Sequence, residues 1–128
     1  MHSTRGLVVH VIDDNSAVRG GFARLLRSAA LEVRAYETME SFLRQIDQAP
    51  PGCIVMDVTM PDLGGPEAIA RLRAVQNSLP IIVVSGHDNQ SVHNFVDAVG
   101  AKMFLRKPVD DQALLDAISW VTKVRVAP

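Results

Sequence analysis

The chain has 128 residues, of which 48% are hydrophobic and 21% charged, and its formal net charge is −1. These values predict one globular domain with a sizeable core, and the scattered Lys and Arg residues argue against a nucleic-acid or membrane-surface footprint. The sequence shows neither a signal peptide nor a membrane span, and its single cysteine, Cys53, excludes a disulfide framework and a cysteine zinc site, so we expect a cytoplasmic protein with a buried thiol.

Apolar runs and helical periodicities alternate along the chain. Strands are predicted at residues 7–12, 32–36, 53–56, 81–84 and 102–105, and the third and fourth are apolar throughout, as in strands buried on both faces. Helices are predicted at residues 16–30, 38–48, 66–77, 89–99 and 110–123, with Thr38 and either Asp110 or Asp111 as caps. Such an alternation predicts a doubly wound α/β fold, in which helices cover both faces of a five-stranded parallel sheet.

Side chains that could bind a metal ion or take part in a reaction follow the predicted strands. Asp13 and Asp14 follow the first strand, Asp57 the third, Ser85 the fourth and Lys107 the fifth. The carboxyl ends of parallel strands lie along one edge of a sheet, so these residues are expected to be neighbours. Gathered carboxylates need a cation, which is either the lysine or a divalent ion, and oxygen ligands suit Mg²⁺ and a phosphoryl group. Asp57 then either holds metal only or attacks phosphorus to form an acyl phosphate.

Taken together, these residues resemble the receiver domain of two-component response regulators, in the CheY-like superfamily. The resemblance rests on Asp13-Asp14, residues 57–61 with Gly65 eight places after the aspartate, residues 85–86 and residues 107–108, and it covers residues 7–120. The amino-acid sequence at residues 11–15 and 85–87 is most similar to that of the FixJ-type branch of the family. The resemblance to the receiver domain implies a flavodoxin-like sheet with strand order 2-1-3-4-5. It also implies a phosphoacceptor protein that is not an enzyme beyond its own phosphorylation and slow dephosphorylation.

The resemblance implies a role for each acidic residue. Asp57 would be the phosphoacceptor. Asp14, Asp57 and the backbone carbonyl of Thr59 would bind Mg²⁺ directly, and Asp13 would support the ion. The phosphoryl donor would be a sensor histidine kinase.

The resemblance also implies a switch. Lys107 would pair with the phosphoryl group and precede a cis peptide bond to Pro108, Ser85 would move toward a phosphoryl oxygen, and Phe104 would change rotamer in response. The surface of the helix at 89–99, the strand at 102–105 and the helix at 110–123 would then act on a downstream protein or output domain. A phosphorylation-dependent homodimer is a further expectation. We expect residues 1–128 to form a single receiver domain, with a core at about 7–123, no output domain and no direct contact with nucleic acid. This domain is either free-standing or one part of a longer regulator.

Each of these assignments has a structural alternative. Asp13 or Asp14 could only cap the first helix, Ser85 could be a turn hydroxyl, and Lys107 a solvated loop residue. Ordinary packing is as good an interpretation of Phe104 as a switch.

Several other residues carry purely structural expectations. His10 and His93 are interpreted as packing or surface residues rather than ligands, and Trp120 as a core or interface residue of the last helix. Gly20 and Gly21 weaken the first helix and predict close packing or a bend there.

Two other classes of function share parts of this pattern. A phosphohydrolase of the haloacid-dehalogenase type also uses an aspartyl phosphate, but it needs a second aspartate at the position of Thr59. A flavodoxin-type binding module needs a phosphate-cradling loop after the first strand, where Asp13 and Asp14 would repel phosphate.

Overall fold

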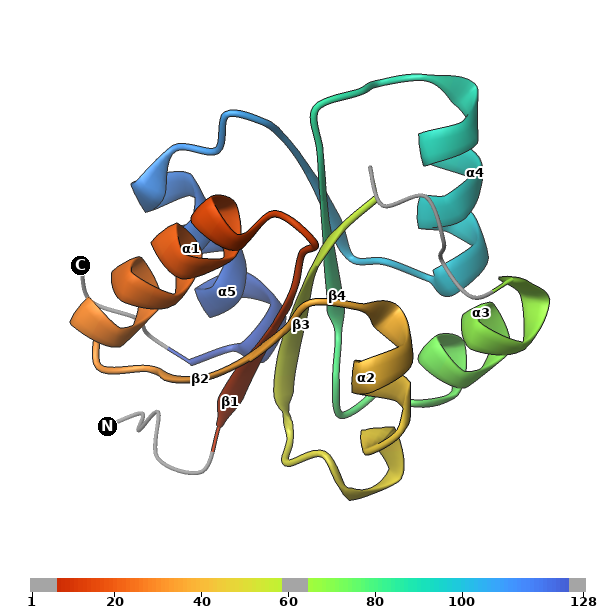
Figure 1. The fold of residues 1–128 in the computed structure, drawn as a ribbon, viewed down its shortest axis with the longest axis horizontal. Helices are drawn as coiled ribbons and strands as arrows, with labels where there is room; N and C mark the ends of the chain where they lie inside the picture. The colour runs from red at the N-terminus through yellow and green to blue at the C-terminus, as the bar shows by residue number, and fades with distance from the viewer. Residues whose placement is uncertain (1–6, 59–64, 125–128) are drawn as a thin grey trace.

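A computed structural model describes residues 7–58 and 65–124, so the backbone carbonyl of Thr59 lies outside the described residues. Five parallel strands form one sheet in the order β2-β1-β3-β4-β5 (Figure 1). The strands are β1 (Val8–Ile12), β2 (Glu32–Tyr36), β3 (Gly52–Asp57), β4 (Ile81–Ser85) and β5 (Met103–Arg106). The predicted fold class and strand order are confirmed.

Helices cover both faces of the sheet, as right-handed crossovers between parallel strands require. The helices are α1 (Ser16–Ser28), α2 (Met39–Leu43), the 3₁₀ turn η1 (Ile46–Gln48), α3 (Gly65–Ala74), α4 (Gln90–Val99) and α5 (Asp111–Thr122). Figure 1 shows α1 and α5 on one side of the sheet and α2, α3 and α4 on the other. No helix in the described part of the chain combines the length and apolarity that crossing a bilayer requires.

The sheet separates two hydrophobic cores. Because side chains alternate along a strand, Val9 and Val55 face α1 and α5, whereas Ile54 and Met56 face α2, α3 and α4. β1, β3 and β4 are buried along their whole length. This double burial explains why their sequences are apolar runs, and it fixes the strand ends on which the site is built.

The predicted helix at residues 38–48 is broken into α2 and η1. Gln45 donates both its backbone N–H (3.1 Å) and its side-chain Nε2 (2.9 Å) to the carbonyl oxygen of Phe42. In a continuous α-helix, that carbonyl would accept from residue 46 instead. The expectation of a single helix was therefore wrong, because a local side-chain bond replaces the helical one.

The helix caps confirm Thr38 as the cap of α2 and decide two choices that the sequence left open. The side chain of Asn15, and neither Asp13 nor Asp14, caps α1 by accepting from the N–H groups of Ala17 and Val18. Asp110 caps α5, which settles the choice between Asp110 and Asp111. The two acids of the β1–α1 turn are therefore not needed as helix caps.

The glycine pair in α1 has open space around it. A Cβ atom on Gly21 would meet nothing within 4 Å, and one on Gly20 would meet only an arginine side-chain nitrogen at 4.0 Å. The expectation of close packing at these glycines was therefore wrong.

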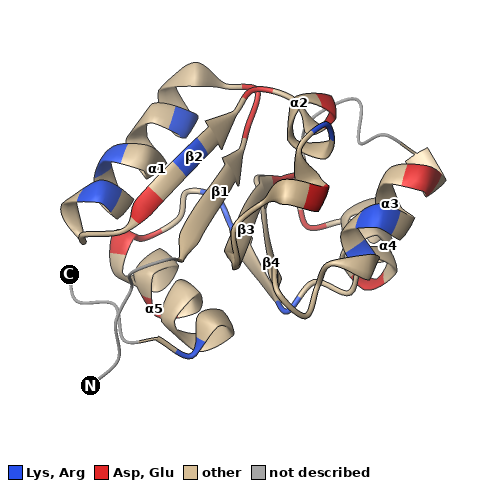
Figure 2. Cartoon of the chain, turned by 90° about the horizontal axis from the view of Figure 1, so that it is seen from below, with Lys and Arg blue, Asp and Glu red and all other residues tan. Residues whose placement is uncertain are grey.

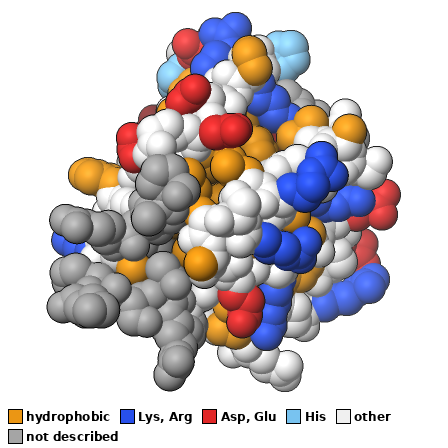
Figure 3. Space-filling view, turned by 90° about the vertical axis from the view of Figure 1, so that its left-hand side faces the viewer, with side chains coloured by type: hydrophobic (Ala, Val, Ile, Leu, Met, Phe, Trp, Pro, Cys, Tyr) orange, Lys and Arg blue, Asp and Glu red, His pale blue; other side chains and the backbone are white. Residues whose placement is uncertain are grey.

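His10 and Trp120 lie in opposite environments. His10 is fully buried on β1, where Nδ1 lies 3.2 Å from the Tyr36 hydroxyl and Nε2 lies 3.2 Å from the Pro50 carbonyl oxygen. The packing role predicted for it is confirmed. Trp120 is 65% exposed, so a core role was wrong and an interface role stays a prediction. The side of the molecule where α1 and α5 lie carries hydrophobic side chains among charged ones (Figure 3).

Candidate functional site

The register of the sheet brings the ends of its strands together. Ile12 pairs with Met56, so the residues that follow β1 lie beside Asp57 at the end of β3. On the other side, Asp57 pairs with Val84 and Ser85 pairs with Arg106, which places the end of β4 between β3 and β5. The chain leaves β1 through acidic residues, drawn red in Figure 2.

Three carboxylates gather at this edge. One oxygen from each of Asp13, Asp14 and Asp57 lies within 4.8 Å of the others. Asp13 is 1% exposed and Asp57 is 3% exposed, whereas Asp14 is open to solvent. The predicted clustering of acids from two strands is thus present. The cluster therefore combines two buried carboxylates with one carboxylate at the surface.

Lys107 supplies a cation to the two buried acids. Its Nζ lies 3.4 Å from Oδ2 of Asp13 and 3.3 Å from Oδ2 of Asp57, and its side chain is 22% exposed. The lysine is therefore not the solvated loop residue of the structural alternative. Lys107 follows the end of β5, and β4, which ends at Ser85, lies between β5 and the strand of Asp57.

The polar groups of Asp13 are held by several partners. Its N–H donates to the Tyr36 carbonyl (3.1 Å), its carboxylate accepts from the Asn15 N–H (2.9 Å), and its carbonyl accepts from Arg19 Nη1 (2.7 Å). Burial raises the pKa of the Asp13 carboxyl above 3.8, and the Asp57 carboxylate raises it further, while the Asn15 N–H and Lys107 oppose the rise. Asp13 is fixed in place and resists ionisation more than a free aspartate.

Arg19 was missed by the sequence reasoning. A cation in the first turn of a helix opposes the helix dipole, so its position in α1 was a signal that it has a specific partner nearby. The structure gives that partner as the Asp13 carbonyl. Arg19 thereby ties α1 to the turn that carries the acids.

The hydroxyl of Ser85 is buried and takes part in a hydrogen bond. Its Oγ accepts a hydrogen bond from the N–H of His87 at 3.0 Å, and its carbonyl oxygen accepts from the N–H of Lys107 at 2.8 Å. The peptide bond between Lys107 and Pro108 is cis, as the resemblance implied. β4 and β5 thus fix the serine beside the lysine.

Phe104 lies half-buried on the face of β5 that α4 covers, packed against the core of α2, α3 and α4. The Phe104 ring contacts the ring of His93 on α4, with the ring centroids 5.6 Å apart. Its position next to Val83 in the sheet places it two residues before the level of Ser85. Such a location fits both packing and a movement coupled to the serine.

Comparison with known proteins settles the family. Residues 9–119 match the family model described as the response regulator receiver domain. The chain belongs to this family. The alternatives of a haloacid-dehalogenase-type phosphohydrolase and of a flavodoxin-type module are not favoured by this match.

Several relatives support the assignment to the FixJ-type branch. The chain is 39% identical over 112 residues to the transcriptional regulatory protein FixJ of Azorhizobium caulinodans, covering 88% of this chain and 53% of that protein. It is 31% identical over 122 residues to the response regulator protein TodT of Pseudomonas putida, covering 95% of this chain and 54% of that protein. The chain therefore spans about half the length of these relatives.

A solved structure agrees with the fold. The response regulator receiver protein of Burkholderia phymatum is 30% identical, with a TM-score of 0.80, and the match covers 95% of this chain and 99% of that one. The described fold of this chain is thus that of a receiver domain.

Proposed function

We propose that this receiver domain takes a phosphoryl group onto Asp57 from a sensor histidine kinase, with Mg²⁺ bound at the acidic cluster. The observation that carries the proposal is the position of Lys107, whose Nζ lies between the buried carboxylates of Asp13 and Asp57. A lysine and three clustered acids from separate strands give a site that can balance the charge of a transferring phosphoryl group.

The donor set fits Mg²⁺. All three side chains offer carboxylate oxygens, which are the hard ligands that this ion prefers, and their oxygens lie within 4.8 Å of one another. We propose Asp14 and Asp57 as direct ligands, together with the backbone carbonyl of Thr59, and Asp13 as a support. When bound, the ion would neutralise charge on the phosphoryl oxygens.

Phosphoryl transfer would use the Asp57 carboxylate as nucleophile. One of its oxygens forms a bond to phosphorus while the bond from phosphorus to the donor nitrogen breaks, and the donor imidazole keeps that electron pair. Lys107, already 3.3 Å from Asp57, stays close enough to pair with the new phosphoryl oxygens. The product is an acyl phosphate on Asp57.

The same event would set the switch. A phosphoryl group on Asp57 offers an acceptor for the Ser85 hydroxyl, which in the structure is held by the His87 N–H. Movement of Ser85 toward that acceptor leaves space that Phe104 fills. The surface of α4, β5 and α5 then changes, and through it the domain would control a downstream protein or an output domain and form a homodimer.

The test is incubation with acetyl phosphate and Mg²⁺, followed by intact-mass measurement. We expect one acid-labile phosphoryl group per chain, lost in the Asp57→Asn variant and retained in Asp111→Asn, a control on the N-terminal turn of α5. Rapid turnover of many phosphoesters would instead support the phosphohydrolase. Sedimentation of the fully phosphorylated protein as a monomer would exclude the dimer.

A further inference from the structure

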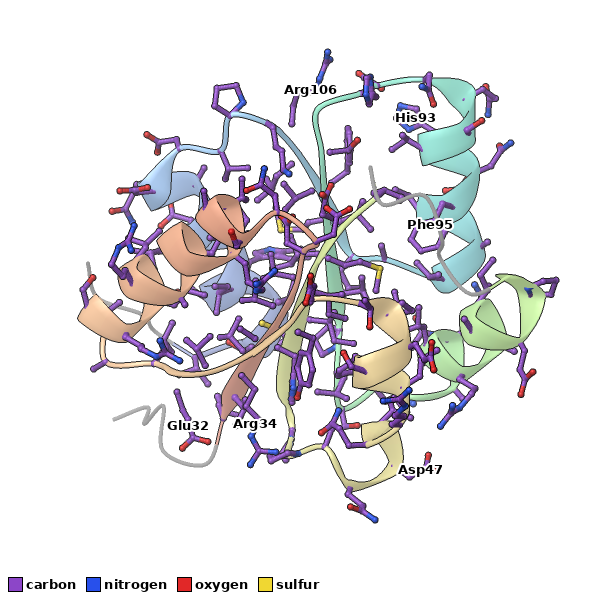
Figure 4. All side chains as sticks on the ribbon, in the orientation of Figure 1. Glu32, Arg34, Asp47, His93, Phe95 and Arg106 are labelled. Atoms are coloured by element: carbon purple, nitrogen blue, oxygen red, sulfur yellow. The ribbon has the colours of Figure 1, made fainter. Side chains whose placement is uncertain are left out.

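Four side chains join the β4–α4 turn to α4 and β5. We call them the Asp88 cluster, which consists of Asp88, His93, Phe104 and Arg106. Asp88 contacts His93 through Oδ1 and Arg106 through Oδ2, the second at 3.8 Å. The His93 ring meets the Phe104 ring edge-on, with an interplanar angle of 60°. Figure 4 shows His93 on α4 and Arg106 at the same end of the molecule.

The cluster contacts the turn that follows Ser85, the last residue of β4. Phe104 and Arg106 lie two residues apart on β5, so their side chains share the face that α4 covers. Arg106 pairs with Ser85 in the sheet, and its Nε donates to the carbonyl oxygen of Gly86 at 3.2 Å. The backbone after Ser85 is therefore held by the same arginine that contacts Asp88.

We propose that the Asp88 cluster stabilises the unphosphorylated arrangement and that His93 is the positioning residue that holds Phe104 against α4. This inference rests on the proposed function, because it assumes that Ser85 and Phe104 move when Asp57 is phosphorylated. Movement of Ser85 shifts the turn that Arg106 and Asp88 hold. Movement of Phe104 separates its ring from His93. Contacts that exist only in the resting state favour that state, so the cluster slows phosphoryl acceptance.

Removing a contact of the Asp88 cluster should change the population of the active arrangement only moderately. The side chains of His93, Asp88 and Arg106 are 50%, 45% and 58% exposed, so each ion pair contributes little by itself. The ring contact between His93 and Phe104 adds a contribution of similar size. Removing His93 ends both its bond to Asp88 and its ring contact, and we expect a change of roughly fivefold in the population of the active arrangement.

The experiment measures the rate at which acetyl phosphate phosphorylates the purified chain in Mg²⁺. We expect His93→Ala to react roughly fivefold faster than the wild type, and Asp88→Asn to react faster by a smaller factor. The double variant should be faster than the wild type by less than the product of the two single effects, because both changes remove the shared contact between Asp88 and His93. His93→Phe, which retains a ring next to Phe104, should fall between His93→Ala and the wild type.

Asn94→Ala is the matched control. Asn94 is exposed on α4 next to His93 and accepts a hydrogen bond from Gln90 at 2.8 Å, so its replacement also removes one surface contact of the helix. Its rate should equal that of the wild type. A purely structural role of His93 would lower the stability of the fold without raising the rate, so urea unfolding of each variant separates the two roles.

The outcomes distinguish this inference from the proposed function. A His93→Ala rate at or below the wild-type rate overturns the inference, as do equal acceleration in Asn94→Ala and additive effects in the double variant. If His93→Ala does not fold, the test is the rate of Asp88→Asn, in which an NH₂ group replaces one carboxylate oxygen. A rate of Asp88→Asn at or below the wild-type rate then overturns the inference. If the wild type takes no phosphoryl group on Asp57, the proposed function fails and the inference fails with it.

Discussion

Replacement of Lys107 by methionine removes a cation that contacts both buried acids and keeps most of the apolar stem. Nζ of Lys107 lies 3.4 Å from Asp13 Oδ2 and 3.3 Å from Asp57 Oδ2. At an effective dielectric constant of about 20, each pair attracts by roughly 5 kcal/mol. The variant leaves two buried carboxylates next to each other without this compensation.

The net loss of stability is smaller than the sum of these attractions. Loss of one partner of a buried ion pair costs about 3–5 kcal/mol. Lys107 is 22% exposed, so water screens it in part. Asp13 also takes up a proton more readily than an ordinary aspartate, because burial raises its pKa. We therefore expect Lys107→Met to lower the free energy of unfolding by about 2 kcal/mol at neutral pH without divalent ions.

Urea unfolding followed by circular dichroism measures this loss, first with a chelator and then in millimolar Mg²⁺. The difference between variant and wild type should shrink by more than half in Mg²⁺, because the ion neutralises the same carboxylates. Lys102→Met, at an exposed lysine just before β5, is the control and should change stability by less than about 0.5 kcal/mol. Equal stabilities of Lys107→Met and wild type in chelator, or a difference that Mg²⁺ does not reduce, would refute the reasoning.

Three further predictions concern the scaffold. Burial lowers the pKa of His10 below 6.5, so the stability that neutral His10 contributes is full above pH 6.5 and is lost as the pH falls toward the lower folded pKa. A pH series of urea unfolding should therefore be flatter below pH 6.5 for His10→Gln than for the wild type, and equal slopes would contradict this. Gly52→Ala should cost at least about 3 kcal/mol, because its Cβ would lie 1.9 Å from the Val8 carbonyl oxygen. Gly21→Ala, with open space around it, should gain about 1 kcal/mol, and a loss there would show that α1 tolerates no side chain at this position.

The fold could be predicted because its determinants are local or periodic. The apolar runs of β3 and β4 are explained by burial on both faces, and the alternation with helices leaves few topologies. The placement of Asp57 and Lys107 at one edge followed from that topology alone. The residues of the candidate site could therefore be named before any distance was known.

Contacts between segments distant in the sequence could not be predicted in the same way. The exposure of Trp120 depends on which other segments of the chain pack against that turn of α5, which periodicity within one helix does not report. The break after α2 has a local cause instead, because it depends on a bond from Gln45 to Phe42 that competes with the helical pattern. The Asp88 contacts with His93 and Arg106 arise only when α4 lies beside β5.

The most direct test of the central claim is to locate the phosphoryl group. After reaction with acetyl phosphate and Mg²⁺, reduction with borohydride converts an aspartyl phosphate into homoserine, and peptide mass spectrometry then identifies the altered residue. We expect conversion at Asp57 alone, with Asp13 and Asp14 unchanged. Homoserine at another aspartate, or none in a fully folded protein, would contradict it.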